Sequence, residues 1–160
     1  MKYIFIVLPF LLLAGCSSLT DEELWRKVDS ARKHQNWDST RMVCKRILSE
    51  YPDGEYAPWA RFGLAESYRF TNEPRNALNN YKIVVTQYPD MKQAELSLFL
   101  VGFIYNNDLH MYDSSKYYYQ AFMAKYPNSD LASSVKVELR MLGKDPQEIL
   151  KEQQSRYAKK

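Results

Sequence analysis

The side chains best suited to nucleophilic or metal chemistry are few, because the chain of 160 residues has two cysteines and two histidines. His34 and His110 lie far apart in the sequence, and neither has a second ligand at the close spacing that a helical metal site needs. No glycine-rich phosphate loop, nucleophile elbow or pair of carboxylates in an apolar setting accompanies them. We therefore predict that the protein is not an enzyme, binds no metal, and carries both histidines as polar surface residues.

Cys16 is the one residue whose surroundings indicate a specific reaction. It ends the segment MKYIFIVLPFLLLAGC, in which Lys2 precedes an apolar run and small residues precede the cysteine. This is the layout of a bacterial export signal, and the apolar run is shorter than the roughly 20 residues of a membrane-spanning helix. Leu13-Ala14-Gly15-Cys16 resembles the lipobox of bacterial lipoproteins, in which the cysteine is joined to diacylglycerol, the signal is cut before it, and the new amine is acylated.

The lipobox resemblance implies a signal peptide over residues 1–15 and a lipidated cysteine with a short tether over residues 16–20. Covalent diacylglycerol and an N-acyl lipid on Cys16 would be the only attached groups, and they would hold the protein at the membrane. Ser17 rather than an aspartate follows the cysteine, so we expect a lipid-anchored protein of the bacterial outer membrane that faces the periplasm. An ordinary signal peptide with an incidental cysteine, or a buried N-terminal helix, are the alternatives.

Cys44 would then be the only remaining thiol, and a single cysteine forms no internal disulfide. A small buried apolar residue is favoured over a nucleophile at this position. The charge of +3 comes from 22 basic and 19 acidic residues and forms no basic patch. We therefore expect no nucleic-acid partner, since nucleic-acid binding requires such a patch.

Residues after the signal form a repeat that must position any functional surface. Tyr51-Pro52-Asp53, Tyr88-Pro89-Asp90 and Tyr126-Pro127-Asn128 recur at steps of 37 and 38 residues, and the third unit has one residue inserted near residues 108–113. Apolar residues within each unit recur at three and four residues, which predicts pairs of amphipathic helices. The expected helices cover residues 21–34, 38–51, 55–71, 75–88, 91–106, 113–126, 129–142 and 146–158.

The second and third units resemble the tetratricopeptide repeat family. Leu64-Ala65-x-x-Tyr68 matches the motif of the first helix, and the small, aromatic and proline positions of the second helix fall on Ala77, Tyr81 and Pro89. The third unit repeats the pattern from Val101-Gly102-x-x-Tyr105 to Pro127, whereas the first unit is degenerate. The resemblance implies an all-α, right-handed solenoid over residues 21–158, with repeats near 21–53, 54–90 and 91–128 and a C-terminal cap over 129–158.

Small residues and tyrosines have distinct packing roles in this pattern. Gly102 is expected to let the paired helix approach closely, with Ser115 facing it, because a bulkier side chain would push the helices apart. Tyr81 and Tyr119 are expected to fill the space between units rather than to stack on a ligand.

The concave surface is the remaining candidate for function. In the tetratricopeptide family the first helix of each unit lines an inner groove, which could receive an extended or helical peptide. Aromatic anchors would supply affinity there, and arginine or asparagine side chains would hold backbone or carboxylate groups. Packing between repeats is the alternative role for each aromatic residue. The groove positions in this chain are Trp25, Asp29, Arg32, Trp59, Phe62, Glu66, Arg69, Phe99, Phe103 and Asn106.

The lipobox together with these repeats is similar to the envelope lipoproteins related to BamD and to the TolA-binding protein. This chain has three repeats and a cap where the BamD group has five, and it lacks the coiled coil of the TolA-binding group. The resemblance implies a membrane-anchored scaffold that binds a protein or peptide partner in outer-membrane protein assembly or envelope organisation. The alternative is a peptidoglycan-binding lipoprotein whose exposed Trp25, Trp37 and Trp59 stack on sugars.

Overall fold

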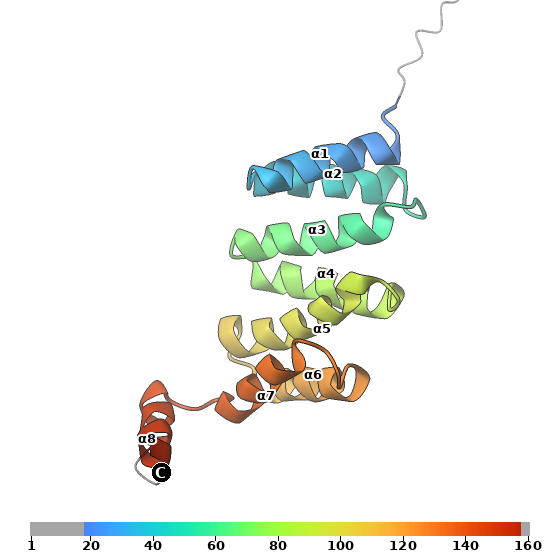
Figure 1. The fold of residues 1–160 in the computed structure, drawn as a ribbon. Helices are drawn as coiled ribbons and strands as arrows, with labels where there is room; N and C mark the ends of the chain where they lie inside the picture. Colours follow the sequence, from blue (N-terminus) through green and yellow to red (C-terminus); the bar gives the residue numbers. More distant parts are fainter. Residues whose placement is uncertain (1–17, 158–160) are drawn as a thin grey trace, which may run out of the picture.

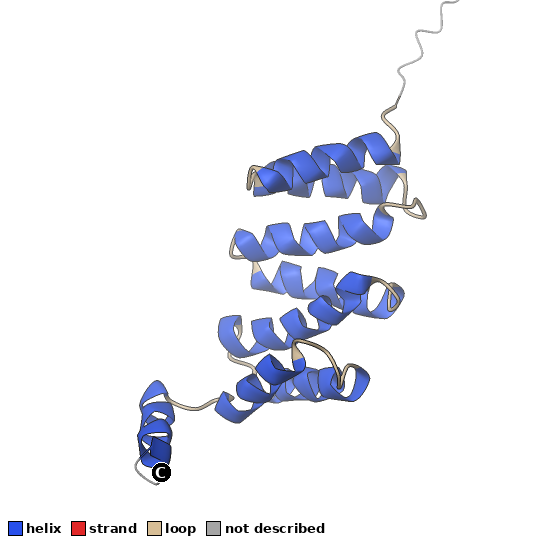
Figure 2. Ribbon diagram, viewed as in Figure 1, coloured by secondary structure: helices blue, strands red, loops and turns tan. Residues whose placement is uncertain are grey.

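The structure, a computed structural model, describes residues 18–157, so the predicted signal peptide and Cys16 lie outside the described residues. Every element of the described part is a helix (Figure 2). The elements are α1 (Asp21–Lys33), α2 (Trp37–Glu50), α3 (Ala57–Phe70), α4 (Pro74–Gln87), α5 (Lys92–Phe103), the π-helix η1 (Ile104–Asp108), α6 (Tyr112–Lys125), α7 (Ala132–Met141) and α8 (Pro146–Tyr157). The eight helices predicted from the sequence are all present, with ends that differ by a few residues.

The helices stack in sequence order, and each helix from α1 to α7 packs against the next (Figure 1). The described residues thus form an all-α solenoid, as the repeat predicts. The odd-numbered helices α1, α3 and α5 begin along the edge of the stack at which the chain enters (Figure 1). The turns that contain the repeated Tyr-Pro pairs join α2 to α3, α4 to α5 and α6 to α7.

Capping residues explain where the first helices begin. The hydroxyl of Thr20 accepts a hydrogen bond from the Glu23 amide at 3.2 Å, and the Glu23 carboxylate accepts one from the Thr20 amide at 2.9 Å. This reciprocal pair is a capping box, which satisfies two backbone donors that a helix start leaves unpaired. The side chain of Asn36 caps α2 in a similar way by accepting from the Ser39 amide at 3.0 Å.

The turns inside the three repeats share one backbone pattern. Gln35, Asn72 and His110 occupy equivalent positions, and all three have a positive φ, between 52° and 59°. In the first two turns, the following residue donates its amide to the carbonyl five residues earlier. Asn36 bonds Ala31 in this way, and Glu73 bonds Tyr68.

The third repeat departs from this pattern at the π-helix η1. The amide of Leu109 bonds the carbonyl of Ile104 five residues earlier, and the amide of Met111 bonds that of Tyr105, six residues earlier. In the second repeat the equivalent bond joins Glu73 to Tyr68, which are five residues apart rather than six. A π-helical turn accommodates one additional residue, so η1 holds the insertion that lengthens this unit from 37 to 38 residues.

Fully buried tyrosines join the repeats, as their register predicts. Tyr81 contacts the cluster between α3, α4 and α5, and Tyr119 contacts the cluster between α5, α6 and α7; both have 0% exposure. The hydroxyl of Ser115 donates to the carbonyl of Gly102 at 2.9 Å. A Cβ at Gly102 would lie 2.6 Å from the ring of Tyr119, so the predicted close approach is confirmed.

The two C-terminal helices differ in how they contact the repeats. Val135 of α7 is fully buried against Leu98, Tyr119 and Phe122, so α7 covers the last repeat. Helix α8 stands apart from the stack (Figure 1), and its Leu150 is 56% exposed. Within the predicted cap, α7 therefore supplies the covering surface.

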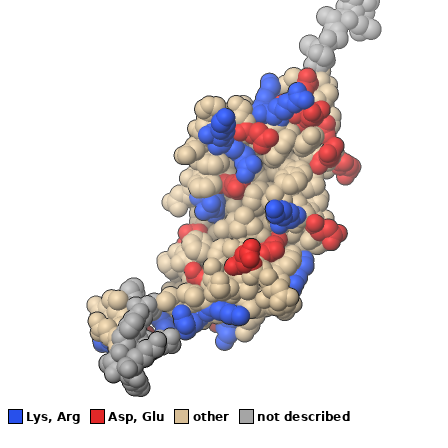
Figure 3. Space-filling view, viewed as in Figure 1, with Lys and Arg blue, Asp and Glu red and all other residues tan. Residues whose placement is uncertain are grey.

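Acidic and basic side chains are interspersed over the face shown in Figure 3. Between residues 18 and 157, no helix is both long and apolar enough to cross a membrane.

Candidate functional site

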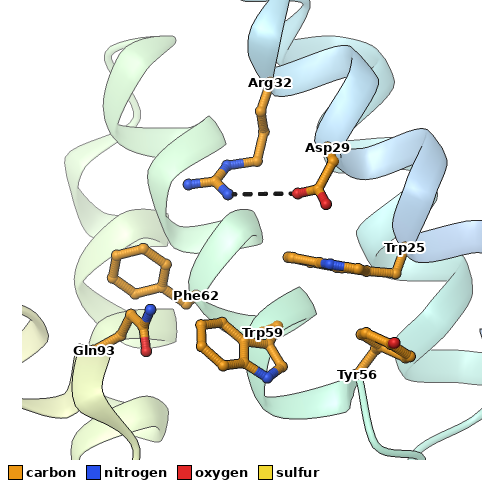
Figure 4. A pocket seen from close by; sticks show the side chains of 7 residues that line it. All are labelled: Trp25, Asp29, Arg32, Tyr56, Trp59, Phe62 and Gln93. Carbon is orange, nitrogen blue, oxygen red and sulfur yellow. Dashed lines mark ion pairs between the residues drawn. The ribbon is translucent and has the colours of Figure 1, made fainter. Parts of the chain in front are cut away.

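A pocket of about 410 Å³ opens where α1, α3 and α5 lie side by side, near the starts of α3 and α5 (Figure 4). Five residues of the predicted groove line it, together with two that the sequence analysis did not select. The lining residues are Trp25, Asp29, Arg32, Tyr56, Trp59, Phe62 and Gln93. The pocket therefore combines an aromatic wall with a charged end.

The aromatic wall is built from rings of neighbouring repeats. Trp25 stacks on Tyr56, with ring centroids 5.8 Å apart, and lies 6.3 Å from Trp59. Trp59 is 37% exposed, whereas Phe62 is 6% exposed and meets the ring of Tyr81 edge-on. Trp59 thus offers surface to a ligand, and Phe62 mainly closes the floor of the pocket.

Arg32 forms the charged end of the pocket. Its guanidinium contacts the Glu66 carboxylate of α3 at 2.5 Å and that of Asp29 at 4.0 Å. Burial raises the pKa of Glu66, and the nearby Arg32 opposes that rise. The ion pair between Arg32 and Glu66 links α1 to α3. It places the guanidinium of Arg32 beside the aromatic wall.

A smaller pocket of about 110 Å³ lies at the other end of these helices. Its lining residues are Arg69, Asn72, Pro74, Phe103 and Asp108. The Arg69 guanidinium lies over the ring of Phe70, 4.3 Å from its centroid. Burial raises the pKa of Asp108, and Arg69 opposes the rise. Two predicted groove residues, Arg69 and Phe103, therefore belong to a separate and smaller site.

Phe99 and Asn106 line neither of these pockets. Phe99 is half-buried, with ring centroids of Tyr119 and Phe122 at 6.1 and 6.4 Å, so it packs between α5 and α6. The amide of Asn106 donates to the carboxylate of Glu138 on α7 at 3.1 Å. Phe99 therefore packs inside the third repeat rather than between repeats, and Asn106 links that repeat to α7.

Tyr56 and Gln93 are the pocket residues that the sequence analysis missed. They are 37 residues apart and occupy equivalent positions, three residues before Trp59 and Leu96. Tyr56 precedes α3 and Gln93 lies in the first turn of α5. Both lie at the starts of the predicted helices 55–71 and 91–106, and their shared place in the 37-residue register is the signal that could have identified them.

The two histidines and Cys44 line neither of these two pockets. The ring of His34 bonds the carbonyl of Ser30 at 2.8 Å, and His110 occupies the positive-φ turn position. Cys44 is buried, and burial raises the pKa of its thiol to about 12. In the described part of the chain, no cluster of three or more His, Cys, Asp or Glu residues could hold a metal ion.

Comparison with known proteins shows to which family the chain belongs. No individual curated protein matches the chain with significance. The family model of the outer membrane lipoprotein YfiO matches residues 17–145, which include the pocket and α1 to α7. This match spans most of the chain and agrees with the repeated helix pairs, and on these grounds the protein belongs to the YfiO family of outer membrane lipoproteins.

Proposed function

We propose that this protein is a lipid-anchored scaffold that binds an extended or helical segment of a protein partner in its aromatic pocket. Diacylglycerol and an N-acyl chain on Cys16 would supply the anchor, and the domain would face the periplasm. Outer-membrane protein assembly or envelope organisation is the cellular role in which we place it. The family and the solenoid architecture support this proposal, since both are typical of proteins that act through partners.

The observation that carries the proposal is the combination of accessible aromatic surface with a fixed ion pair. Trp59 and Trp25 offer ring faces from adjacent repeats, and Arg32 is held by Glu66 beside them. Aromatic and arginine side chains contribute most of the binding energy in protein interfaces. A peptide could place an apolar side chain against the indoles and pair its polar groups with Asp29 or Arg32.

Site-directed crosslinking in cells tests the location of the interface. A photoreactive phenylalanine analogue replaces Trp59 in the pocket or Tyr117 on α6, which is 66% exposed. We expect a discrete adduct with one envelope protein from position 59 and none from position 117. An adduct of equal yield from both positions, or from Tyr117 alone, would argue against the pocket.

Affinity for the captured partner then tests the chemistry. Trp59→Ala is expected to weaken binding by at least about 2 kcal/mol, the size of a typical interface anchor, while its exposure limits the loss of folding stability. Tyr117→Ala is the matched control on α6. Unchanged affinity in the Trp59 variant would contradict the proposal.

Peptidoglycan binding is the second candidate, because Trp25 and Trp59 lie 6.3 Å apart and could form a stacking platform for sugars. Trp37 does not join them, since its ring stacks on Phe70 at 4.2 Å. Sedimentation of the lipoprotein with purified cell wall distinguishes the two candidates. Cosedimentation that Trp59→Ala abolishes, without any protein adduct at this position, would favour the glycan.

A further inference from the structure

Residues close to the predicted anchor already contact the solenoid. The hydroxyl of Tyr51 donates to the carbonyl of Leu19 at 2.7 Å, and Leu19 packs against the core of the first repeat. Thr20 then forms the capping box of α1, and the Asp21 carboxylate lies against Gly54. The chain is therefore held to the solenoid from Leu19 onward.

Two residues, Ser17 and Ser18, separate Leu19 from Cys16. Consecutive Cα atoms are 3.8 Å apart, so the Cα atoms of Cys16 and Leu19 can be at most about 11 Å apart. If Cys16 carries its acyl chains in a bilayer, the start of α1 must lie at the headgroup layer. A tether of this length does not allow the domain to move freely away from the surface.

The edge of the solenoid at this point has a defined composition. It comprises the start of α1, the end of α2 and the turn into α3, with Leu19, Tyr51 and Tyr56 packed in one cluster. We call this edge the entry rim. The pocket residues Tyr56 and Trp59 lie on it or in the first turn beyond it, so the rim and the aromatic pocket share one end of the odd-numbered helices.

We propose that the entry rim rests on the zwitterionic headgroup layer of the bilayer that holds the anchor, with α1 leading away from it. This proposal rests on the lipid anchor of the proposed function. Tyrosine and tryptophan rings favour the headgroup region, where an apolar ring and a polar group are both solvated. The exposed carboxylates of the same rim, which are those of Glu22, Glu23, Asp53 and Glu55, oppose deeper insertion and contact with anionic lipids. The aromatic pocket would then receive its partner close to the membrane surface.

Trp25 and Trp37 lie at different distances from the entry rim. Trp25 lies in the second turn of α1 on the rim side, whereas Trp37 follows the far end of that helix. The eight residues from Trp25 to the end of α1 at Lys33 rise by about 12 Å, so the two indoles differ by roughly that distance in their separation from the rim. Energy transfer from tryptophan to a dansyl-labelled lipid headgroup would register this difference.

The experiment uses the mature lipoprotein reconstituted in phosphatidylcholine vesicles that contain a dansyl-headgroup lipid. One variant keeps only Trp25 (Trp37→Phe, Trp59→Phe) and the other keeps only Trp37 (Trp25→Phe, Trp59→Phe). Donor lifetimes with and without the acceptor give the transfer efficiency of each. We expect at least about twofold higher efficiency for Trp25, because about 12 Å of α1 separates the levels of the two indoles. Circular dichroism confirms that both variants are folded.

Tether variants test the cause of the proximity. An insertion of about eight Gly and Ser residues between Ser18 and Leu19 forms a flexible linker, and it should lower transfer from Trp25 toward that of Trp37. Tyr51→Phe removes the bond to Leu19 and should lower transfer less, whereas Tyr88→Phe, at the equivalent position of the next repeat, should have no effect. Replacing part of the phosphatidylcholine with phosphatidylglycerol should also reduce transfer, and Asp53→Asn with Glu55→Gln should restore part of it, because Glu22 and Glu23 keep their charge.

Two failures of this experiment are distinguishable. If the wild-type lipoprotein does not float with the vesicles, the anchor itself is wrong, and the placement of the rim falls with it. If it floats but Trp25 and Trp37 transfer equally, or Trp37 transfers more, the anchor stands and the placement of the entry rim is overturned.

Discussion

Small side chains set how closely neighbouring helices approach in this solenoid. Cys44 fills the contact between α2 and α3, where a Cβ on Gly63 would lie 3.2 Å from its sulfur. Gly102 has the same role between α5 and α6, facing the ring of Tyr119. Because both contacts are buried, changes at single atoms there affect the free energy of unfolding directly.

The pH dependence of stability should reveal the buried state of Cys44. Burial raises the pKa of the folded thiol from 9.0 to about 12. Above about pH 9 the unfolded thiol ionises while the folded thiol keeps its proton, so the folded state binds more protons and stability falls as pH rises. We expect a loss of roughly 1 kcal/mol per pH unit from this group, measured by denaturant unfolding between about pH 8 and pH 10.

Cys44→Ala provides the control for this slope. The variant should lose the additional pH dependence between about pH 9 and pH 10, while Tyr81 and Tyr119, whose pKa values burial also raises, still contribute at higher pH. The native thiol should also resist alkylation until the protein unfolds. Rapid alkylation of Cys44 in the folded lipoprotein would show that the contact between α2 and α3 is open.

A methyl group at Gly102 should destabilise the third repeat. The added Cβ would lie 2.6 Å from two ring carbons of Tyr119, which is fully buried. We expect Gly102→Ala to cost about 1–3 kcal/mol, as overpacking of a core does. Thermal melting followed by circular dichroism measures the loss.

Gly63→Ala is the comparison for this variant. Its new methyl would meet one sulfur atom at 3.2 Å rather than an aromatic ring at 2.6 Å, so the loss should be smaller. Melting temperatures that rank the two variants in the opposite order would contradict the assigned packing between α5 and α6.

Among the helices, the π-turn η1 shows how one element absorbs an irregular repeat. The hydrogen bonds from Leu109 to Ile104 and from Met111 to Tyr105 hold one residue more than the equivalent turns. The insertion therefore remains outside the contact between α5 and α6, and Gly102 and Ser115 stay paired at 2.9 Å.

Removing the inserted residue should thus be tolerated. Deletion of Asn107, which is exposed, would restore the 37-residue step and allow an α-helical end like that of α3. We expect the helical content to be retained and stability to change by at most about 1 kcal/mol, as is usual for surface changes.

Deletion of Leu98 is the contrasting change. It would rotate the rest of α5 by about 100° and remove its buried face from α6. That protein should fail to fold cooperatively, and two deletions with the same effect on melting would refute the account of η1.

The sequence was sufficient to predict the helix pairs, because Tyr-Pro turns and amphipathic spacing are local signals. It located the insertion near residues 108–113 but did not predict that a π-helix would hold it, since that choice depends on how α5 packs against α6. The groove was predicted in part. Trp25, Arg32 and Trp59 line the pocket. Asn106 does not, because its side-chain amide donates a hydrogen bond to Glu138 of α7. No repeat signal foretells a contact with a nonrepeated helix.

Across the molecule as a whole, the last two described helices differ in how they contact the solenoid. At the C-terminal end, α7 buries Val135 against the last repeat, whereas every α8 side chain whose exposure is described lies open to solvent. A solenoid needs a cover over its terminal apolar surface, and α7 supplies it here.

Two truncations should separate the contributions of α7 and α8. A chain that stops after residue 144 lacks α8 and should melt within a few degrees of the full chain. A chain that stops after residue 128 also lacks α7, exposes Tyr119 and Phe122, and should lose on the order of several kcal/mol from apolar burial. Sedimentation would show aggregation of the shorter protein alone, and equal stability of both would exclude α7 as the cover.

The packing of each helix on its neighbour in sequence also bears on how the chain acquires its structure. Contacts between helices join mainly neighbours in the chain, and helical topologies of this kind fold fast because little loop-closure entropy precedes the first favourable contacts. A chain delivered to its compartment amino end first would complete the α1–α2 pair before α6 emerged. Each later pair would dock on the pair before it, and the apolar surface at the growing end would stay open until α7 covers the last repeat.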